Sequence, residues 1–198
     1  MITDTVGGIT LRFETNEDCF SPQHLDKGTL FMLSRITFGA EDKVLDLGCG
    51  YGTVGIFAAK TALPQNVYMT DINPQALLCA RKNAELNGVT QVHIIESDAY
   101  DGLAETGFDL IISNPPYHTD FSVAKRFIEK GFNRLKIGGR MFMVTKRREW
   151  YKNKLISVFG GVKIYEQDGY FVFEAQKRDA NYANAPHAHG KNKKADPS

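Results

Sequence analysis

Short apolar runs alternate with helical patterns along most of this chain, and that alternation constrains the fold more than any other feature of the sequence. Strand-like runs followed by amphipathic helices predict a mainly parallel sheet that is covered by helices on both faces. The runs that we interpret as strands are residues 43–50, 66–73, 92–100, 108–116 and 140–146. The patterns that we interpret as helices are residues 26–36, 53–61, 74–88, 122–135 and 149–159.

Both ends of the chain depart from this alternation. Residues 162–177 predict two strands joined by an Asp-Gly turn, which would add an antiparallel C-terminal hairpin to the sheet. Residues 1–36 predict short strands or an arm, followed by a helix. We expect a single α/β domain over residues 1–178 and a disordered tail over residues 179–198, which lack leucine, isoleucine and valine.

Composition argues against several classes of protein. No run approaches the roughly 18–20 apolar residues that a membrane span needs, and the N-terminus lacks the apolar core of a signal peptide. Cys19, Cys49 and Cys79 have no CxxC spacing, so neither a disulfide framework nor a zinc site is expected. We therefore expect a cytoplasmic protein with no membrane partner and no metal ion.

Positive charge is concentrated in residues 125–154, although the formal net charge of the whole chain is only +1. Such asymmetry favours a polyanionic partner, and RNA in single-stranded or loop form suits a small enzyme. The alternative is a solvated helix face with scattered surface lysines. The candidate RNA-binding residues are Lys146, Arg147 and Arg148, which follow a predicted strand end.

A glycine-rich turn, LDLGCGYG (residues 45–52), joins the first buried strand to a helix. Asp46 lies just before the turn, where it could orient the turn or face an ammonium group through water. Asp71 and Asp98 end the next two strands, and an acid at the position of Asp71 commonly binds the two hydroxyls of a ribose. The turn has neither GxGxxG nor P-loop spacing, so an adenosine-type ligand without a pyrophosphate fits better than NAD or ATP.

The segment SNPPYH (residues 113–118) ends the fourth strand with a second chemical signal. Asn114 Oδ1 and the carbonyl of Pro115 can accept hydrogen bonds from a planar amino group, and the prolines Pro115 and Pro116 restrain that backbone. Tyr117 offers a flat face for a planar base, and His118 is a rim residue or a proton relay. The alternative is a strand stopped by proline and capped by asparagine.

These motifs, in this order, resemble a class I S-adenosylmethionine-dependent methyltransferase. The quoted segments are VLDLGCGYG (44–52), DINPQAL (71–77), ESDAY (96–100) and IISNPPY (111–117). The resemblance implies a Rossmann-like, doubly wound, seven-stranded sheet with a reversed last strand. It also implies that methyl transfer is directed to an exocyclic or amide nitrogen, because methyltransferases with Asn-Pro-Pro-Tyr at the fourth strand act on such nitrogens.

The resemblance assigns cofactor contacts to the strand ends. Asp71 would hold the ribose hydroxyls with Ile72 against the adenine, and Asp98 and Ala99 would lie at the adenine edge. The residues placed near the methionine part of the cofactor are Gly48, Cys49 and Gly50.

The segment FSPQHLDKGT (residues 20–29) narrows the resemblance to small-domain methyltransferases that act on the exocyclic amine of guanine in small-subunit ribosomal RNA. In that family the segment closes over the cofactor, with Lys27, Gly28 and Thr29 near its carboxylate end. Full-length enzymes of the family have two related halves, whereas this chain has one, which leaves the RNA open.

Other functions remain open from the sequence. One is an adenine amino-group methyltransferase that acts on tRNA or rRNA, and another is a glutamine methyltransferase of release factors. A non-enzyme alternative is an inactive platform that binds cofactor or RNA.

Overall fold

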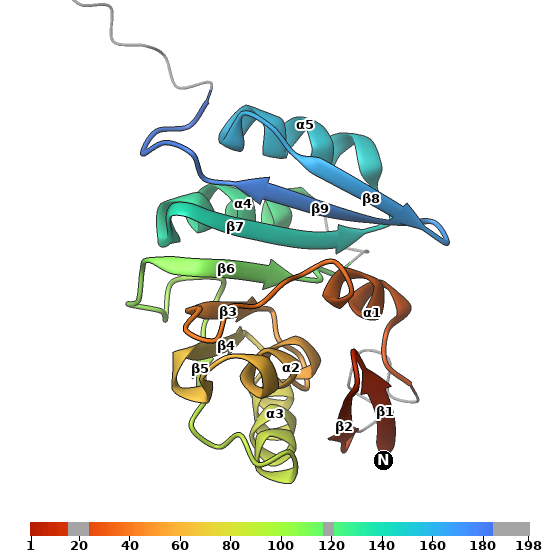
Figure 1. The fold of residues 1–198 in the computed structure, drawn as a ribbon. Helices are drawn as coiled ribbons and strands as arrows, with labels where there is room; N and C mark the ends of the chain where they lie inside the picture. The colour runs from red at the N-terminus through yellow and green to blue at the C-terminus, as the bar shows by residue number, and fades with distance from the viewer. Residues whose placement is uncertain (16–23, 117–120, 184–198) are drawn as a thin grey trace, which may run out of the picture.

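One mixed sheet forms the centre of the fold. The computed structural model describes residues 1–15, 24–116 and 121–183. Its seven-stranded sheet has the order β5-β4-β3-β6-β7-β9-β8, in which β5 to β7 are parallel and β9 is antiparallel to both neighbours (Figure 1). This arrangement confirms the predicted sheet and its C-terminal hairpin. The strands are β3 (Val44–Leu47), β4 (Val67–Asp71), β5 (His93–Glu96), β6 (Phe108–Ser113), β7 (Leu135–Thr145), β8 (Lys163–Gln167) and β9 (Tyr170–Gln176).

Helices cover both faces of this sheet, and each face has its own apolar core (Figure 1). The central strands are apolar almost throughout because both of their faces are buried; every residue of β3 is buried. On one face lie α1 (Lys27–Leu33), α2 (Thr53–Thr61) and α3 (Pro74–Leu86), with a short 3-10 turn at Pro64–Asn66. On the other face lie α4 (Phe121–Arg134) and α5 (Arg148–Phe159).

Several elements are shorter than the sequence predicts. β5 ends at Glu96 rather than at residue 100, and β6 ends at Ser113, just before the prolines that cannot extend its ladder. α1 spans seven residues, where the sequence predicted a helix over residues 26–36. These shorter elements leave loops at the carboxyl ends of the strands, which is where side chains can face a ligand.

One strand is longer than predicted. β7 begins at Leu135, and its pairing with β6 shifts register between Phe108 and Leu110. The strand therefore starts five residues before the predicted start at residue 140, and Gly138 and Gly139 lie within it at a bulge. Backbone hydrogen bonds hold that bulge, because Gly138 N donates to Lys177 O and Lys177 N donates to Gly139 O.

An N-terminal hairpin forms a second, two-stranded sheet. Its strands are β1 (Ile2–Val6) and β2 (Ile9–Phe13), joined at Gly7 and Gly8, so the predicted short strands are present. Leu11 and Phe13 are fully buried in the core that also contains residues of α1, α2 and α3. The hairpin is thus part of the same hydrophobic core as the main sheet.

Two asparagines, one in α3 and one at its C-cap, bind the backbone at this hairpin. Asn87 accepts a hydrogen bond from Arg12 N and donates to Arg12 O, at 3.1 and 2.6 Å. Asn83 accepts a hydrogen bond from Glu14 N at 2.7 Å and donates to Glu14 O at 3.0 Å. It also donates to Tyr51 O at 2.9 Å. Both side chains are buried, and they substitute for a neighbouring strand at the free edge of β2.

The first residues of the predicted disordered tail are bound to the domain. Tyr182 packs edge-on against Phe132, with ring centroids 4.9 Å apart, and its hydroxyl donates to Glu129 O at 2.8 Å. Ala183 N donates to Val158 O at 3.0 Å. The chain therefore stays on the α4 and α5 face beyond residue 178, and residues 184–198 lie outside the described residues. Within the described part of the chain, no helix has the length and apolar character of a membrane span.

We predict that Asn83→Ala destabilises the protein by about 3 kcal/mol, because it removes three hydrogen bonds and leaves the buried carbonyl of Tyr51 and the part-buried backbone groups of Glu14 without the Asn83 amide. Chemical denaturation measures this change. Asn133→Ala is the matched control, because the Asn133 amide makes only hydrogen bonds of 3.5 Å at the surface. Equal stability of the two variants would contradict the role given to Asn83.

Candidate active site

A cavity of about 400 Å³ lies at the carboxyl ends of the parallel strands. It lies where the order of the strands in the sheet changes side. From β3, the strands β4 and β5 lie on one side, and β6 and β7 lie on the other. Ligand sites of open α/β sheets form at such a switch point. The candidate residues from the sequence that line the cavity are Thr29, Asp46, Gly48, Cys49, Gly50, Asp71, Ile72, Asp98, Ala99, Asn114, Pro115 and Pro116.

The glycine turn after β3 forms one wall of the cavity. Gly48, Gly50 and Gly52 have φ values of 74°, 55° and 100°, a left-handed conformation that other residues adopt only with strain. Gly48 N and Cys49 N both donate to Thr70 O, at 2.8 and 2.9 Å, which ties the turn to β4. The turn therefore requires glycine for its conformation, as its sequence indicated.

Asp46 connects the turn to the start of α2. Its Oδ2 accepts a hydrogen bond from Gly55 N at 2.7 Å, and the side chain is buried. Burial raises the pKa of Asp46 to about 7; the bond from Gly55 opposes this rise and the negative charge of Asp71 adds to it. The carboxyl group thus orients the turn, and it titrates near neutral pH.

Cys49 also faces the cavity, but it does not have the properties of a nucleophile. Burial raises the pKa of its thiol, and the nearby charges of Asp46 and Asp71 raise it further. A thiolate is the reactive form of cysteine, so this side chain stays protonated at neutral pH.

Asp71 at the end of β4 holds the turn and its own loop. Its Oδ2 accepts from Gly50 N at 2.8 Å and its Oδ1 accepts from Asn73 N at 2.9 Å. Each carboxylate oxygen can accept a further hydrogen bond, as the two hydroxyls of a ribose require. The next side chain, Ile72, is 63% exposed at the cavity edge, which is a large apolar surface for a planar ring to cover.

The loop after β5 brings Asp98 and Ala99 to the cavity. Ser97 fixes this loop, because its hydroxyl donates to Ala99 O at 2.8 Å and accepts from Gly102 N at 2.9 Å. Ala99 has a φ of 55°, which is uncommon for a residue with a side chain. The carboxylate of Asp98 pairs with Arg126 of α4 at 2.8 Å.

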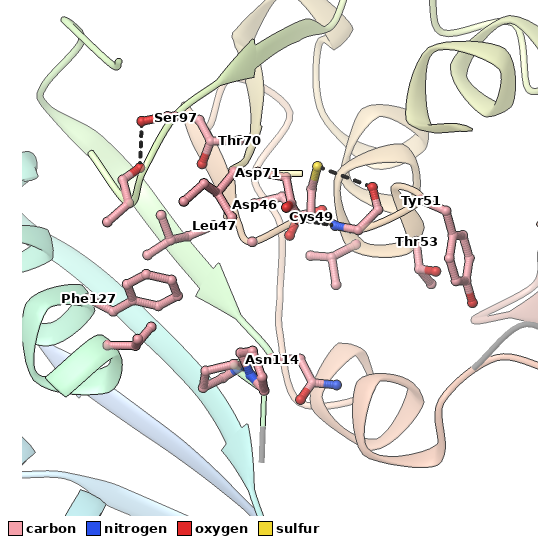
Figure 2. Close-up of a pocket in the computed structure, with 18 of the residues that line it drawn as sticks. Asp46, Leu47, Cys49, Tyr51, Thr53, Thr70, Asp71, Ser97, Asn114 and Phe127 are labelled. Carbon is pink, nitrogen blue, oxygen red and sulfur yellow. Dashed lines mark hydrogen bonds between the residues drawn. The ribbon is translucent and has the colours of Figure 1, made fainter. Parts of the chain in front are cut away.

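Asn114 follows β6 and faces α1 (Figure 2). Its Nδ2 donates to Asp26 Oδ1 and to Thr29 Oγ1, each at 2.9 Å. Both protons of the amide are thereby used. Its Oδ1 is buried and has no hydrogen-bond partner among the described residues. A buried acceptor without a partner is costly, so this oxygen is suited to a donor that a ligand brings.

The surroundings of Asn114 match only part of the prediction. Tyr117 and His118 lie outside the described residues, so their predicted contacts stay predictions. Lys27 and Gly28 do not line the cavity, and Gly28 instead packs under Tyr170, whose ring lies 2.6 Å from where a Cβ on Gly28 would be. The α1 residues that reach the cavity are Asp26 and Thr29.

Sequence patterns missed several residues that line the cavity. Phe127 and Val123 project from α4, and Figure 2 shows the Phe127 ring beside the strand ends. The sequence placed both residues only within the predicted helix over residues 122–135. The other lining residues that sequence reasoning did not select are Asp26, Leu47, Tyr51, Thr53, Val54, Thr70 and Ser97.

Acidic partners neutralise much of the basic run. Arg126 and Lys130 both pair with Asp101, and Lys130 does so at 2.7 Å. Lys154 pairs with Glu129 in the same way. The uneven charge along the sequence is thus largely balanced by residues brought close in the fold, and it supports a polyanionic partner less strongly than the sequence indicated.

Lys146, Arg147 and Arg148 lie outside the cavity lining, just after β7. Lys146 Nζ lies 4.8 Å from the Tyr170 ring centroid, and Arg147 Cζ lies 5.0 Å from that of Phe121. Phe121 in turn stacks on Trp150, with centroids 4.3 Å apart and an interplanar angle of 13°. Arg148 pairs with Glu149 at 2.7 Å. β7 runs parallel to β6, so this cationic and aromatic group follows the strand beside the Asn114 strand.

No group of three or more histidine, cysteine, aspartate or glutamate side chains suited to a metal ion occurs among residues 1–15, 24–116 and 121–183. The lining of the cavity contains carboxylates, a glycine turn, the amide oxygen of Asn114 and apolar side chains. Such a lining suits an organic ligand with hydroxyl and amino groups.

Comparison with known structures points to one family. A T. thermophilus 16S rRNA N2 methyltransferase, RsmC, in complex with AdoMet and guanosine superposes with a TM-score of 0.81 and 28% identity, over 89% of this chain and 50% of that one. TrmN from Thermus thermophilus has a TM-score of 0.61 and 28% identity, over 69% of this chain and 44% of that one. The chain thus spans about half the length of these enzymes.

Sequence relatives agree with these structures. Ribosomal RNA small subunit methyltransferase C of Haemophilus influenzae is 37% identical over 77% of this chain and 47% of its own length. The uncharacterized protein YbxB of Bacillus subtilis is 30% identical over 83% of this chain and 85% of its own length. The Methyltransferase small domain family matches residues 10–174. The chain belongs to the methyltransferase small domain family, as the sequence predicted, and its structural neighbour RsmC holds AdoMet, the cofactor that the sequence also predicted.

Proposed function

We propose that this protein transfers a methyl group from S-adenosylmethionine to the exocyclic amino nitrogen of an RNA base, and that the base is guanine, methylated at N2, in small-subunit ribosomal RNA. The observation that carries this proposal is the buried Oδ1 of Asn114, which lies in the cavity and has no hydrogen-bond partner in the part of the chain that the structure describes. This oxygen can accept a hydrogen bond from an amino group and cannot donate one.

An amino nitrogen on an aromatic ring needs help to act as a nucleophile, since its lone pair is delocalised into the ring. Hydrogen bonds from its protons to Asn114 Oδ1 and to the carbonyl of Pro115 would orient the nitrogen and stabilise the positive charge that develops on it. Pro115 is buried, lines the cavity and has a restricted φ, so its backbone is held in place.

The lining of the cavity fits S-adenosylmethionine. Asp71 has acceptor capacity left for ribose hydroxyls, and exposed Ile72 offers an apolar face for adenine. The turn from Gly48 to Gly50 leaves its backbone accessible to the amino acid part of the cofactor. When bound, the cofactor supplies an electrophilic methyl group on its sulfonium; the chain's own residues orient the acceptor and exclude water.

Guanine is favoured over adenine and glutamine by one comparison. The T. thermophilus relative, named as an N2 methyltransferase, holds both AdoMet and guanosine and shares the fold of this chain at a TM-score of 0.81. The names of the sequence relatives also refer to small-subunit ribosomal RNA. Adenine, glutamine and an inactive binding platform are the other outcomes of the experiment below.

RNA binding would involve the cationic and aromatic group beside the Asn114 strand. Lys146 and Arg147 are exposed, and they lie against the rings of Tyr170 and Phe121. Exposed cations can contact phosphates, and the aromatic rings can stack with unpaired bases. This group therefore supports an RNA substrate, because it combines exposed cations with aromatic rings beside the Asn114 strand.

We predict that Asn114→Ala reduces methyl transfer by at least about 100-fold and leaves the Kd for S-adenosylmethionine within about threefold of wild type. Labelled cofactor is incubated with total RNA, release factors or DNA, and the product is identified by mass spectrometry. Methylguanosine supports the proposal, whereas methyladenosine or methylglutamine would redirect it to another acceptor. Transfer by Asn114→Ala at the wild-type rate would refute the role of the amide.

We predict that the double variant Lys146→Ala, Arg147→Ala weakens RNA binding about tenfold. The slope of the logarithm of the binding constant against the logarithm of the salt concentration should fall in magnitude by about two, one for each lost cation. Filter binding across a salt series measures both quantities. Lys130→Ala is the matched control, because Lys130 already pairs with Asp101 at 2.7 Å. Equal weakening by the control variant would show that binding depends on net charge and not on this surface.

We predict a pH dependence that arises from Asp46. Its pKa is raised to about 7, so the folded protein holds this proton more tightly than the unfolded chain, and stability falls as pH rises from about 4 to about 7. A cationic cofactor favours the ionised carboxylate, so its stabilising effect should grow as pH rises through 7. Thermal unfolding from pH 5 to 8.5, with and without cofactor, tests both trends. Asp46→Asn should reduce the pH dependence of stability and of the cofactor's stabilising effect. An unchanged pH dependence in that variant would show that it does not arise from Asp46.

A further inference from the structure

We infer that Asp26 and Thr29 are positioning residues that fix the orientation of the Asn114 amide, so that its oxygen and not its nitrogen faces the acceptor. This inference rests on the proposed function. An asparagine amide can rotate by 180°, and the rotated form would present two donors to an amino group that needs acceptors. Something in the protein must therefore select one of the two orientations.

The contacts on the amide nitrogen make that selection. Nδ2 donates one proton to Asp26 Oδ1 and one to Thr29 Oγ1, each at 2.9 Å. The Thr29 hydroxyl donates its own proton to Asp26 Oδ1 at 3.2 Å, so its oxygen is left to accept from the amide. A carboxylate only accepts hydrogen bonds, so a rotated amide would place its oxygen against acceptors and lose both bonds.

Helix α1 holds the two partners in place. Asp26 is the N-cap of α1, and its Oδ1 also accepts from Thr29 N at 2.8 Å. Thr29 is buried, and Gly28 between them packs against the Tyr170 ring of β9. The same oxygen of Asp26 thus caps the helix and binds the amide, which couples the docking of α1 to the orientation of Asn114.

This arrangement gives the segment before the first buried strand a function that differs from the expected one. The resemblance placed Lys27, Gly28 and Thr29 near the carboxylate end of the cofactor. In the structure Asp26 and Thr29 contact the amide of Asn114, and Lys27 does not line the cavity. An amide nitrogen with two protons needs two hydrogen-bond acceptors, and the carboxylate of Asp26 and the hydroxyl oxygen of Thr29 supply them.

A reciprocal exchange of the two side chains tests the coupling. Asn114→Asp should lose at least about 100-fold in kcat, because two carboxylates would lie at the distance of a hydrogen bond. Adding Asp26→Asn should restore at least about tenfold over Asn114→Asp, since it removes one of the two facing carboxylates and an amide at 26 can donate to a carboxylate at 114. Independent, multiplicative effects of the two substitutions would overturn the inference.

Removal of one hydroxyl gives a second test that preserves the helix cap. Thr29→Val should lower kcat about tenfold with little change in the KM for RNA or the Kd for cofactor, and Thr29→Ser should restore kcat. Thr10→Val is the control for loss of a threonine hydroxyl, because Thr10 lies exposed on β2 and bonds only with Thr5. A tenfold weaker cofactor Kd with unchanged kcat would make Thr29 a cofactor contact instead and overturn the inference.

A readout that does not need activity separates this inference from the proposed function. The side-chain amide resonances of Asn114, assigned by their loss in Asn114→Ala, should show two protons protected from exchange in the wild type. Thr29→Val should leave only one of them protected. Fast exchange of both protons in the wild type would overturn the inference, whereas protected protons in a protein that methylates nothing would leave the network intact and refute the proposed function.

Discussion

The hydrogen bonds from the Asn114 amide to Asp26 and Thr29 connect the two parts of the molecule on which the site depends. One part is the sheet, whose strand β6 ends at Ser113, so that the next residue, Asn114, lines the cavity. The other is helix α1, which is packed on the opposite side of the amide. Because both amide protons are bound by α1, the oxygen is left as a buried acceptor. The proposed chemistry of the site depends on this oxygen.

The topology of the sheet explains why the remaining site residues converge. The carboxyl ends of β3, β4, β5 and β6 lie side by side, so the loops that follow them line one cavity although they are distant in sequence. Each loop is stabilised by hydrogen bonds to its neighbours: Gly48 N to Thr70 O, Gly50 N to the Asp71 carboxylate, and Gly102 N to Ser97. A preformed cavity of this kind lowers the cost of ordering the site when ligand binds.

The sequence predicted the elements whose pattern is local, and it did not predict contacts that depend on tertiary structure. Alternating strands and helices, the glycine turn and the acids at the strand ends are local signals, and they led to the correct sheet and most of the cavity lining. The bonds of Asn83 and Asn87 to the N-terminal backbone span about 70 residues and carry no pattern. The free charge of the basic run could not be judged from the sequence, because acidic partners such as Asp101 and Glu129 are brought close only by folding. Asp26 was visible in its motif, but only the structure showed that it contacts Asn114.

The account depends most on how an acceptor base sits against Asn114. A crystal structure of the protein with S-adenosylhomocysteine and guanosine would measure this directly. We expect the guanine N2 atom at about 2.7–3.2 Å from Asn114 Oδ1, within the same distance of the Pro115 carbonyl, and facing the sulfur of the cofactor product. A structure in which Asn114 Oδ1 binds the ribose or the cofactor, with the base amino group elsewhere, would contradict the account.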